Sequence, residues 1–144
     1  MRGYSAIGLY NPKSPHNIGA TLRALDCFES SLLLVQGKRY EVSATDTTKA
    51  FRRTPMIHVA DLRLSIPYDC VPVAIEVIKG AQDLREYVHP QRALYIFGPE
   101  DGSLPRKVLG WCRDIVSVPT HVCMNLAACV NVVLYDRLFK EKSL

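Results

Sequence analysis

An arginine in the stretch NIGATLRA, residues 17–24, is the first side chain whose type and spacing could do chemistry. Arg23 lies one helical turn after Gly19 on the same predicted face, where the missing side chain would let a ligand approach the guanidinium. A planar, permanently protonated guanidinium offers a fork of donors suited to phosphate oxygens. Two interpretations stay open: Arg23 acts on a ligand, or it forms a surface ion pair with Asp26. Asn17 is predicted to be the N-cap of this helix.

The stretch FGPEDGSLP, residues 97–105, is a second candidate. An apolar strand ends there in a turn rich in Gly, Pro and Asp, and open α/β sheets bind ligands at the carboxyl ends of their strands. Gly98 and Gly102 allow a close approach of the backbone. The pattern is neither a dinucleotide fingerprint nor a phosphate-binding loop. Glu100 is interpreted either as a functional carboxylate near a cation or as a structural partner of a helix N-terminus.

The third candidate is VPTHVCMNLAACVNVVLYD, residues 118–136, in which a strand crosses a short polar loop into an apolar helix. Asn125 at the start of that helix is typical of an N-cap. Asn131 is a predicted buried amide that needs partners, within the chain or across a subunit interface. Cys123 and Cys129 lack the histidine partner expected of a nucleophile, and the four histidines are too scattered to predict a metal site.

The strands and helices that position these side chains are predicted from alternating β-rich runs and helical patterns. Strands are predicted over residues 4–10, 31–37, 71–78, 92–98 and 113–119. Helices are predicted over residues 17–28, 81–88, 105–112 and 125–142. The last is apolar around nearly its whole circumference as far as Tyr135, as in a helix buried against the sheet or against another subunit. Residues 38–70 are the least regular. The order predicts an α/β domain with a mostly parallel sheet flanked by helices.

Length and composition limit the class of protein. A chain of 144 residues, 48% hydrophobic and 22% charged, predicts one globular domain over residues 1–144. A net charge of +4 suits an acidic partner such as RNA without requiring one. No signal peptide or membrane span is predicted, so we expect a cytoplasmic protein. Five cysteines without a C-x-x-C pair predict reduced thiols.

The three stretches, in this order, resemble the motifs of the SpoU/TrmH family of RNA 2′-O-ribose methyltransferases in the SPOUT superfamily. NIGATLRA resembles the first family motif, N-x-G-x-x-x-R, and FGPEDGSLP resembles the second, G-x-E-x-x-G-L. The third resembles I-P-M, then S-[LM]-N-[LV]-S, and a closing helix that ends in L-Y-E. The sequence departs from these motifs at Ser103, Thr120, Cys123 and Ala127.

The resemblance implies a C-terminal trefoil knot, a homodimer with its active site at the subunit interface, and S-adenosylmethionine as cofactor. It assigns the cofactor pocket to three loops, through Glu76, Gly98, Val118, Pro119, Cys123, Met124 and Leu126. Because most family contacts to the adenosine come from the backbone, these loops tolerate side-chain changes.

The resemblance also implies a central role for Arg23, which similar proteins describe as a base. A guanidinium with a pKa above about 12 accepts a proton poorly. We therefore expect Arg23 to bind a phosphate and to stabilise the developing alkoxide. Asn17, Glu100 and Asn125 would hold the arginine and the loops in register. Further RNA contacts are expected from four basic residues, Arg39, Lys49, Arg52 and Arg53, each equally interpretable as a solvated surface charge.

The sequence thus predicts an S-adenosylmethionine-dependent RNA 2′-O-methyltransferase. The absence of an added RNA-binding domain resembles the minimal branch of the family, which includes enzymes of the tRNA wobble nucleotide, so tRNA is favoured over rRNA. The alternatives are a non-catalytic RNA-binding module that kept the knot and a different nucleotide-binding α/β enzyme.

Overall fold

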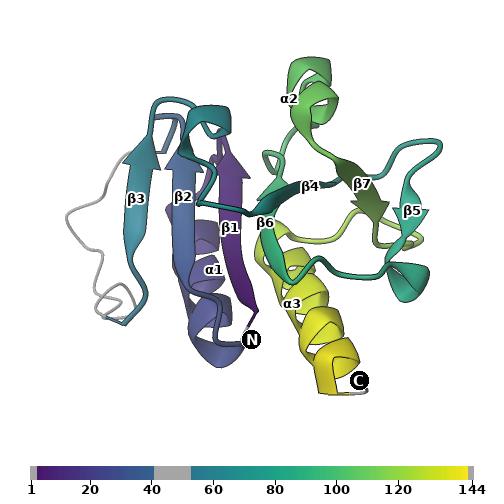
Figure 1. The fold of residues 1–144 in the computed structure, drawn as a ribbon. Coiled ribbons are helices and arrows are strands. Elements are labelled where there is room, and N and C mark those ends of the chain that lie inside the picture. The colour runs from purple at the N-terminus through teal and green to yellow at the C-terminus, as the bar shows by residue number, and fades with distance from the viewer. Residues whose placement is uncertain (1–2, 41–52, 143–144) are drawn as a thin grey trace.

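The computed structural model of the protein describes residues 3–40 and 53–142. Within these ranges seven strands form one parallel sheet in the order β3-β2-β1-β6-β4-β7-β5 (Figure 1). Because the strands are parallel, their carboxyl ends meet at one edge. The strands are β1 Tyr4–Tyr10, β2 Leu32–Gln36, β3 Met56–Val59, β4 Val71–Ile75, β5 Gln82–Asp83, β6 Arg92–Phe97 and β7 Asp114–Ser117.

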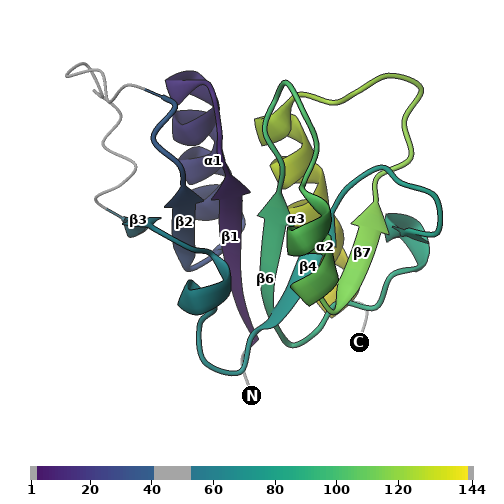
Figure 2. The ribbon, with the colours of Figure 1, turned by 90° about the horizontal axis from the view of Figure 1, so that it is seen from above.

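Helices cover both faces of the sheet. Helices α1 (Pro15–Cys27) and α3 (Leu126–Lys142) lie side by side on one face, and α2 (Arg106–Trp111) covers the other (Figures 1 and 2). Successive residues of a strand point to opposite faces, which divides the core in two. Ile7 of β1 belongs to the cluster beneath α1 and α3, whereas Ala6 belongs to the cluster beneath α2. This arrangement confirms the predicted α/β fold with flanking helices; the trefoil knot stays a prediction.

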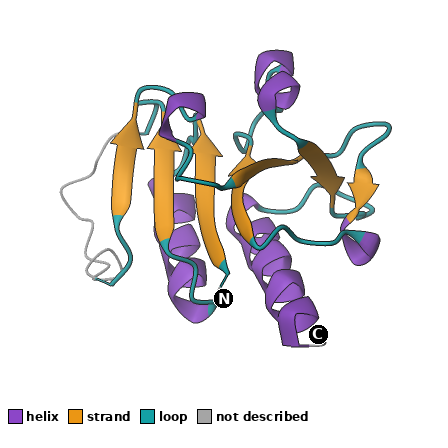
Figure 3. Ribbon diagram, in the orientation of Figure 1, coloured by secondary structure: helices purple, strands orange, loops and turns teal. Residues whose placement is uncertain are grey.

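The helix predicted over residues 81–88 is wrong. The segment contains strand β5 and a 3-10 helix, Leu84–Glu86 (Figure 3). Leu84 and Tyr87 are buried three residues apart, which matches the three-residue turn of a 3-10 helix. Asp83 stabilises the turn by accepting a hydrogen bond from the backbone N–H of Arg85 at 2.9 Å.

One helix start and one strand also differ from the predictions. Helix α1 begins at Pro15 with Ser14 at the N-cap, so the prediction of Asn17 as N-cap is wrong and Asn17 lies in the first turn. Proline at the first helical position has the required φ and needs no hydrogen bond. Strand β3 lies in the segment predicted to be irregular, where it pairs in parallel with β2. The strand has only four residues, and its central Ile57 and His58 are both exposed, so no alternation of buried and exposed residues marks it in the sequence.

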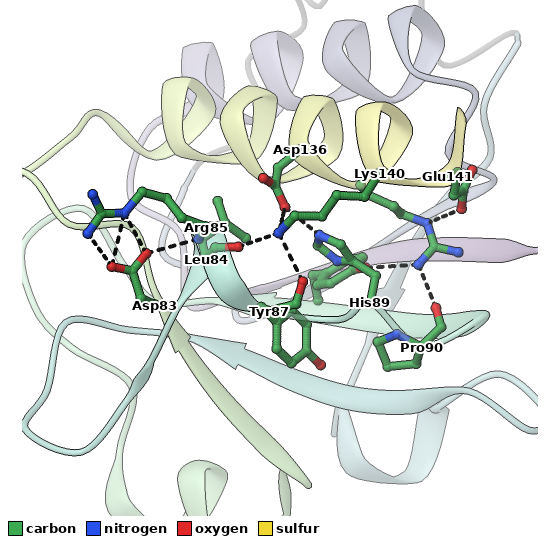
Figure 4. A network of polar contacts seen from close by, with 11 residues as sticks. Asp83, Leu84, Arg85, Tyr87, His89, Pro90, Asp136, Lys140 and Glu141 are labelled. Atoms are coloured by element: carbon green, nitrogen blue, oxygen red, sulfur yellow. Dashed lines mark hydrogen bonds and ion pairs between the residues drawn. The ribbon is translucent and has the colours of Figure 1, made fainter. Parts of the chain in front are cut away.

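Polar contacts fix the C-terminal half of α3 to the segment before β6 (Figure 4). Arg137, 5% exposed, donates to the carbonyl oxygen of Pro90 and to the hydroxyl of Tyr95. His89 Nε2 lies 2.7 Å from the carboxylate of Asp136, and His89 Nδ1 lies 2.7 Å from the Tyr95 hydroxyl. These contacts anchor the C-terminal half of α3, the helix that Asn125 precedes.

Candidate functional site

A pocket opens at the carboxyl ends of β4, β6 and β7, with a volume of about 710 Å³ that includes space open to solvent. All but one of the residues predicted to contact the cofactor line it; Pro119 does not. The floor is apolar and includes Ile75, Phe97 and Leu126. The predicted lining residues present are Glu76, Gly98, Val118, Cys123, Met124 and Leu126.

Glu76 joins two of the pocket loops. Its Oε1 accepts a hydrogen bond from the N–H of Val77 at 3.0 Å, and its Oε2 accepts one from the N–H of Leu104 at 2.8 Å. The loop after β4 is thereby tied to the loop after β6. Glu76 holds the shape of the pocket and also contributes a carboxylate to its wall.

Gly98 allows the loop after β6 to fold back on itself. A Cβ at this position would lie 3.1 Å from the backbone nitrogen of Leu104 and 3.3 Å from the carbonyl carbon of Ser103. Backbone atoms cannot rotate away as a side chain can. A side chain at position 98 would therefore crowd the backbone of residues 103 and 104, and glycine avoids this contact.

Glu100 binds the start of α1. Its carboxylate accepts hydrogen bonds from the N–H of Lys13 at 2.9 Å, from the N–H of Ser14 at 2.7 Å and from Asn17 Nδ2 at 3.2 Å. These backbone donors lie at a helix N-terminus, which favours a negative charge. Burial raises the pKa of Glu100, but the donors of Lys13, Asn17 and Ser14 outweigh burial and hold the pKa below its usual value. Glu100 is thus a partner of the α1 N-terminus, and its role near a cation stays a prediction.

The same chain of hydrogen bonds reaches α3. Asn125 Nδ2 donates to Asn17 Oδ1 at 3.0 Å, and Asn125 Oδ1 accepts from the N–H of Ala128 at 3.1 Å. The second contact confirms Asn125 as the cap of α3. One side chain from each motif, Asn17, Glu100 and Asn125, therefore takes part in a single hydrogen-bonded chain at the carboxyl edge of the sheet.

Arg23 lies outside this chain. It is an exposed residue of α1 and does not line the pocket of its own chain. It lies six positions after Asn17, about 9 Å along the helix axis. Within residues 3–40 and 53–142 no ion pair joins Arg23 to Asp26, whose carboxylate instead accepts a hydrogen bond from Thr54 Oγ1. The guanidinium thus faces solvent.

Arg39 makes a two-pronged ion pair with Asp101, with N–O distances of 2.9 and 2.8 Å, and also donates to the carbonyl oxygen of Asn11. The ion pair raises the pKa of Arg39 and lowers the pKa of Asp101. The guanidinium of Arg39, which was predicted to bind RNA, is thus engaged within the protein. Arg53 is exposed, and the predicted contacts Lys49 and Arg52 lie outside the described residues.

Sequence reasoning missed several lining residues, among them Ile75, Phe97 and Cys129, and it missed the ion pair of Arg39 with Asp101. Ile75 and Phe97 end strands β4 and β6, and Cys129 lies one turn into α3, so their places at the carboxyl edge of the sheet could have indicated the pocket. The contact of Arg39 with Asp101 joins residues 62 positions apart, and no local pattern indicates it.

A sequence model of the SpoU rRNA Methylase family matches residues 5–135, nearly the whole chain. The chain belongs to the SpoU rRNA methylase family. The match spans all three motifs and includes the hydrogen-bonded chain that joins them. No match is found among curated proteins.

Solved structures share the fold at low sequence identity. AviRb from Streptomyces viridochromogenes, a SpoU methyltransferase in complex with AdoMet, aligns with a TM-score of 0.83 and 21% identity over 100% of this chain and 63% of AviRb. The chain thus spans less than two thirds of AviRb. A structure that concerns the 2-OH methylation of C/U34 on tRNA aligns over 100% of both chains, with a TM-score of 0.85 and 19% identity. A TrmH/SpoU tRNA modifying enzyme from A. aeolicus aligns with a TM-score of 0.84 and 15% identity over 99% of this chain and 77% of that enzyme.

The described residues contain neither a membrane-spanning helix nor a cluster of metal ligands. No helix there combines the length and apolarity needed to cross a membrane. Over the same residues, no three His, Cys, Asp or Glu side chains gather in a way that could hold a metal ion.

Proposed function

We propose that the protein transfers a methyl group from S-adenosylmethionine to a ribose 2′-hydroxyl of RNA, with tRNA as the favoured substrate class. The observation that carries the proposal is the hydrogen-bonded chain from Glu100 through Asn17 to Asn125. It joins the three family motifs at the edge of the sheet where the pocket opens. Neighbouring folds include an AdoMet complex and a structure concerned with tRNA 2-OH methylation, which support the cofactor and the substrate class.

The lining of the pocket suits the chemistry of S-adenosylmethionine. Its apolar floor of Ile75, Phe97 and Leu126 suits an adenine ring. Carboxylates from Glu76 and Glu100 line the same pocket and complement a positively charged ligand. When bound, the cofactor supplies an electrophilic methyl group on a sulfonium.

The protein must then position a ribose hydroxyl and stabilise charge on its oxygen. An exposed guanidinium such as that of Arg23 binds the neighbouring phosphate and stabilises negative charge as it develops on the 2′-oxygen. Glu100, Asn17 and Asn125 act as positioning residues, because they fix the start of α1 against the pocket loop and α3. Apolar lining from Leu126 and Met124 excludes water.

A homodimer forms part of the proposal. Helix α3 exposes an apolar stripe: Val132 is 37% exposed, and Tyr135 and Phe139 are each 60% exposed. Arg23 lies on the neighbouring helix α1, outside the pocket of its own chain. A second copy on this surface would cover the stripe, and the reacting groups would then meet at the interface. Val132→Asp is expected to yield a monomer in analytical ultracentrifugation; a variant that sediments like the wild type would contradict the dimer.

Calorimetry and methyl transfer test the proposal together. S-adenosylhomocysteine should bind the wild type, and Arg23→Ala should bind it equally well while losing methyl transfer to tRNA. The matched control is Arg113→Ala, which removes an exposed arginine at the amino end of β7. Absence of binding at millimolar ligand would contradict the cofactor, and a fully active Arg23→Ala would contradict the role of Arg23.

A further inference from the structure

A second pocket lies at the same edge of the sheet, beyond the proposed cofactor site. It is formed where β1 and β2 end, at Tyr10 and Gln36, and is also lined by Lys107 and Trp111 of α2. Its volume is about 660 Å³, including space open to solvent. The first pocket lies at β4, β6 and β7, so the two occupy opposite halves of the carboxyl edge. At a strand spacing of about 4.8 Å, their centres are roughly 10 to 15 Å apart.

The charged groups of this pocket suit a phosphate. Arg63 and Lys107 line it, and within the described ranges neither side chain has an ion-pair partner. The single acidic lining residue, Asp61, accepts a hydrogen bond from the N–H of Arg63 at 2.9 Å. The side-chain oxygen of Gln36 accepts from the N–H of Leu62 at 2.8 Å. The two cations therefore remain available to an anion.

The aromatic groups suit a nucleobase. Tyr10 and Trp111 line the pocket from β1 and α2, and both are partly exposed. Single-stranded nucleic acids are held by a combination of aromatic faces for the bases and cations for the backbone. Arg63, Lys107, Tyr10 and Trp111 bring both kinds of group into one pocket.

We infer that this pocket binds one nucleotide of the RNA strand whose neighbouring nucleotide is methylated at the first pocket. The phosphate lies against Arg63 and Lys107, and the base lies against Tyr10 and Trp111. The inference rests on the proposed function, since it takes RNA as the substrate. This RNA-binding site is separate from the four basic residues that were predicted from the sequence to contact RNA.

Fluorescence anisotropy with labelled bulk tRNA and with a short oligouridylate tests the inference. Arg63→Ala and Lys107→Ala should each weaken RNA binding roughly three- to tenfold at low salt. Each should also reduce the slope of log K against log salt by about 0.7 for the single strand. Tyr10→Leu keeps apolar volume but removes the ring, and should weaken oligouridylate binding about tenfold. Arg113→Ala, the matched control, should change neither affinity nor slope.

Each outcome has a definite meaning. Pocket variants that bind RNA like Arg113→Ala would overturn the inference, as would a wild type that binds no RNA. Binding of uridine monophosphate is measured in parallel. If the variants weaken the binding of uridine monophosphate but not the binding of RNA, the occupant is a free nucleotide, and this too would overturn the inference. A wild type that binds RNA through Arg63 and Lys107 but transfers no methyl group would support the pocket and contradict the proposed function.

Discussion

Replacing the carboxylate of Glu100 by an amide should destabilise the protein measurably. Glu100→Gln turns one of two acceptor oxygens into an NH₂ group that faces donors from Ser14 and Asn17. Hydrogen bonds to a charged group contribute about 1.5 to 3 kcal/mol each, and partial exposure reduces this contribution. We therefore expect a loss of about 2 kcal/mol in the free energy of unfolding. For a chain of this length the Tm should fall by about 4 to 8 °C.

The pH dependence of this effect follows from the lowered pKa of Glu100. A carboxyl whose pKa is lower in the folded state adds stability above its unfolded pKa, and this stability is lost as the pH falls through the folded value. The Tm difference between the wild type and Glu100→Gln should therefore shrink as the pH falls from 7 to below about 4. Thermal unfolding followed by circular dichroism measures both quantities.

A matched control separates this contact from a general charge effect. Glu86→Gln removes an exposed carboxylate on the 3-10 helix Leu84–Glu86 and should leave the Tm within about 1 °C. Equal Tm values for the wild type and Glu100→Gln at pH 7 would refute the reasoning. So would a Tm difference that stays constant on acidification.

Three further predictions follow from other contacts. Arg39→Asp or Asp101→Arg should weaken S-adenosylhomocysteine binding several-fold, and the double exchange should restore part of it, because the ion pair holds the pocket loop. Gly98→Ala should weaken the same binding, whereas Gly102→Ala, whose Cβ would meet its nearest neighbour at an ordinary 3.5 Å, should not. Burial lowers the pKa of His89, so the wild type should lose stability as the pH falls below about 6.5, and urea unfolding of His89→Gln should show a flatter pH profile.

The neutral state of His89 is consistent with its contacts. Arg137 donates to the oxygen of Tyr95, which leaves the Tyr95 hydroxyl proton for His89 Nδ1. His89 Nε2 then donates to the carboxylate of Asp136. Protonation of Nδ1 would place two donors against Tyr95 and disrupt this order, as the lowered pKa of His89 also indicates.

The fold was largely predictable because its strands and long helices carry strong patterns. Strand β1 and helix α1 were found within two residues of their ends. The prediction of an α-helix over residues 81–88 was wrong because the pattern of eight residues does not distinguish an α-helical turn from a 3-10 turn beside an edge strand. Helix α3 is apolar around nearly its whole circumference as far as Tyr135, yet the sheet and α1 cover only part of it, and Tyr135 remains exposed. The sequence pattern shows that the helix is apolar, but it does not show whether the sheet, another helix or another subunit packs against each face.

The candidate site was predictable in its residues but less so in its contacts. The motif resemblance identified Glu100, Asn17 and Asn125, and the structure joins them by hydrogen bonds. That Glu100 binds the backbone of residues 13 and 14 could not be predicted, because 86 and more positions separate the partners. The pocket at Arg63 and Lys107 combines four separate segments, and no short motif indicates it.

The central claim is transfer of a methyl group to a ribose 2′-oxygen of RNA, and alkaline hydrolysis after labelled transfer tests it most directly. Alkali cleaves RNA through attack of the 2′-oxygen on the adjacent phosphate, so a methylated 2′-oxygen leaves an uncleaved dinucleotide. After incubation of tRNA with methyl-labelled S-adenosylmethionine, we predict label in alkali-resistant dinucleotides with the wild type and none with Arg23→Ala. Label confined to mononucleotides, or no transfer by the wild type to tRNA or rRNA, would contradict the account.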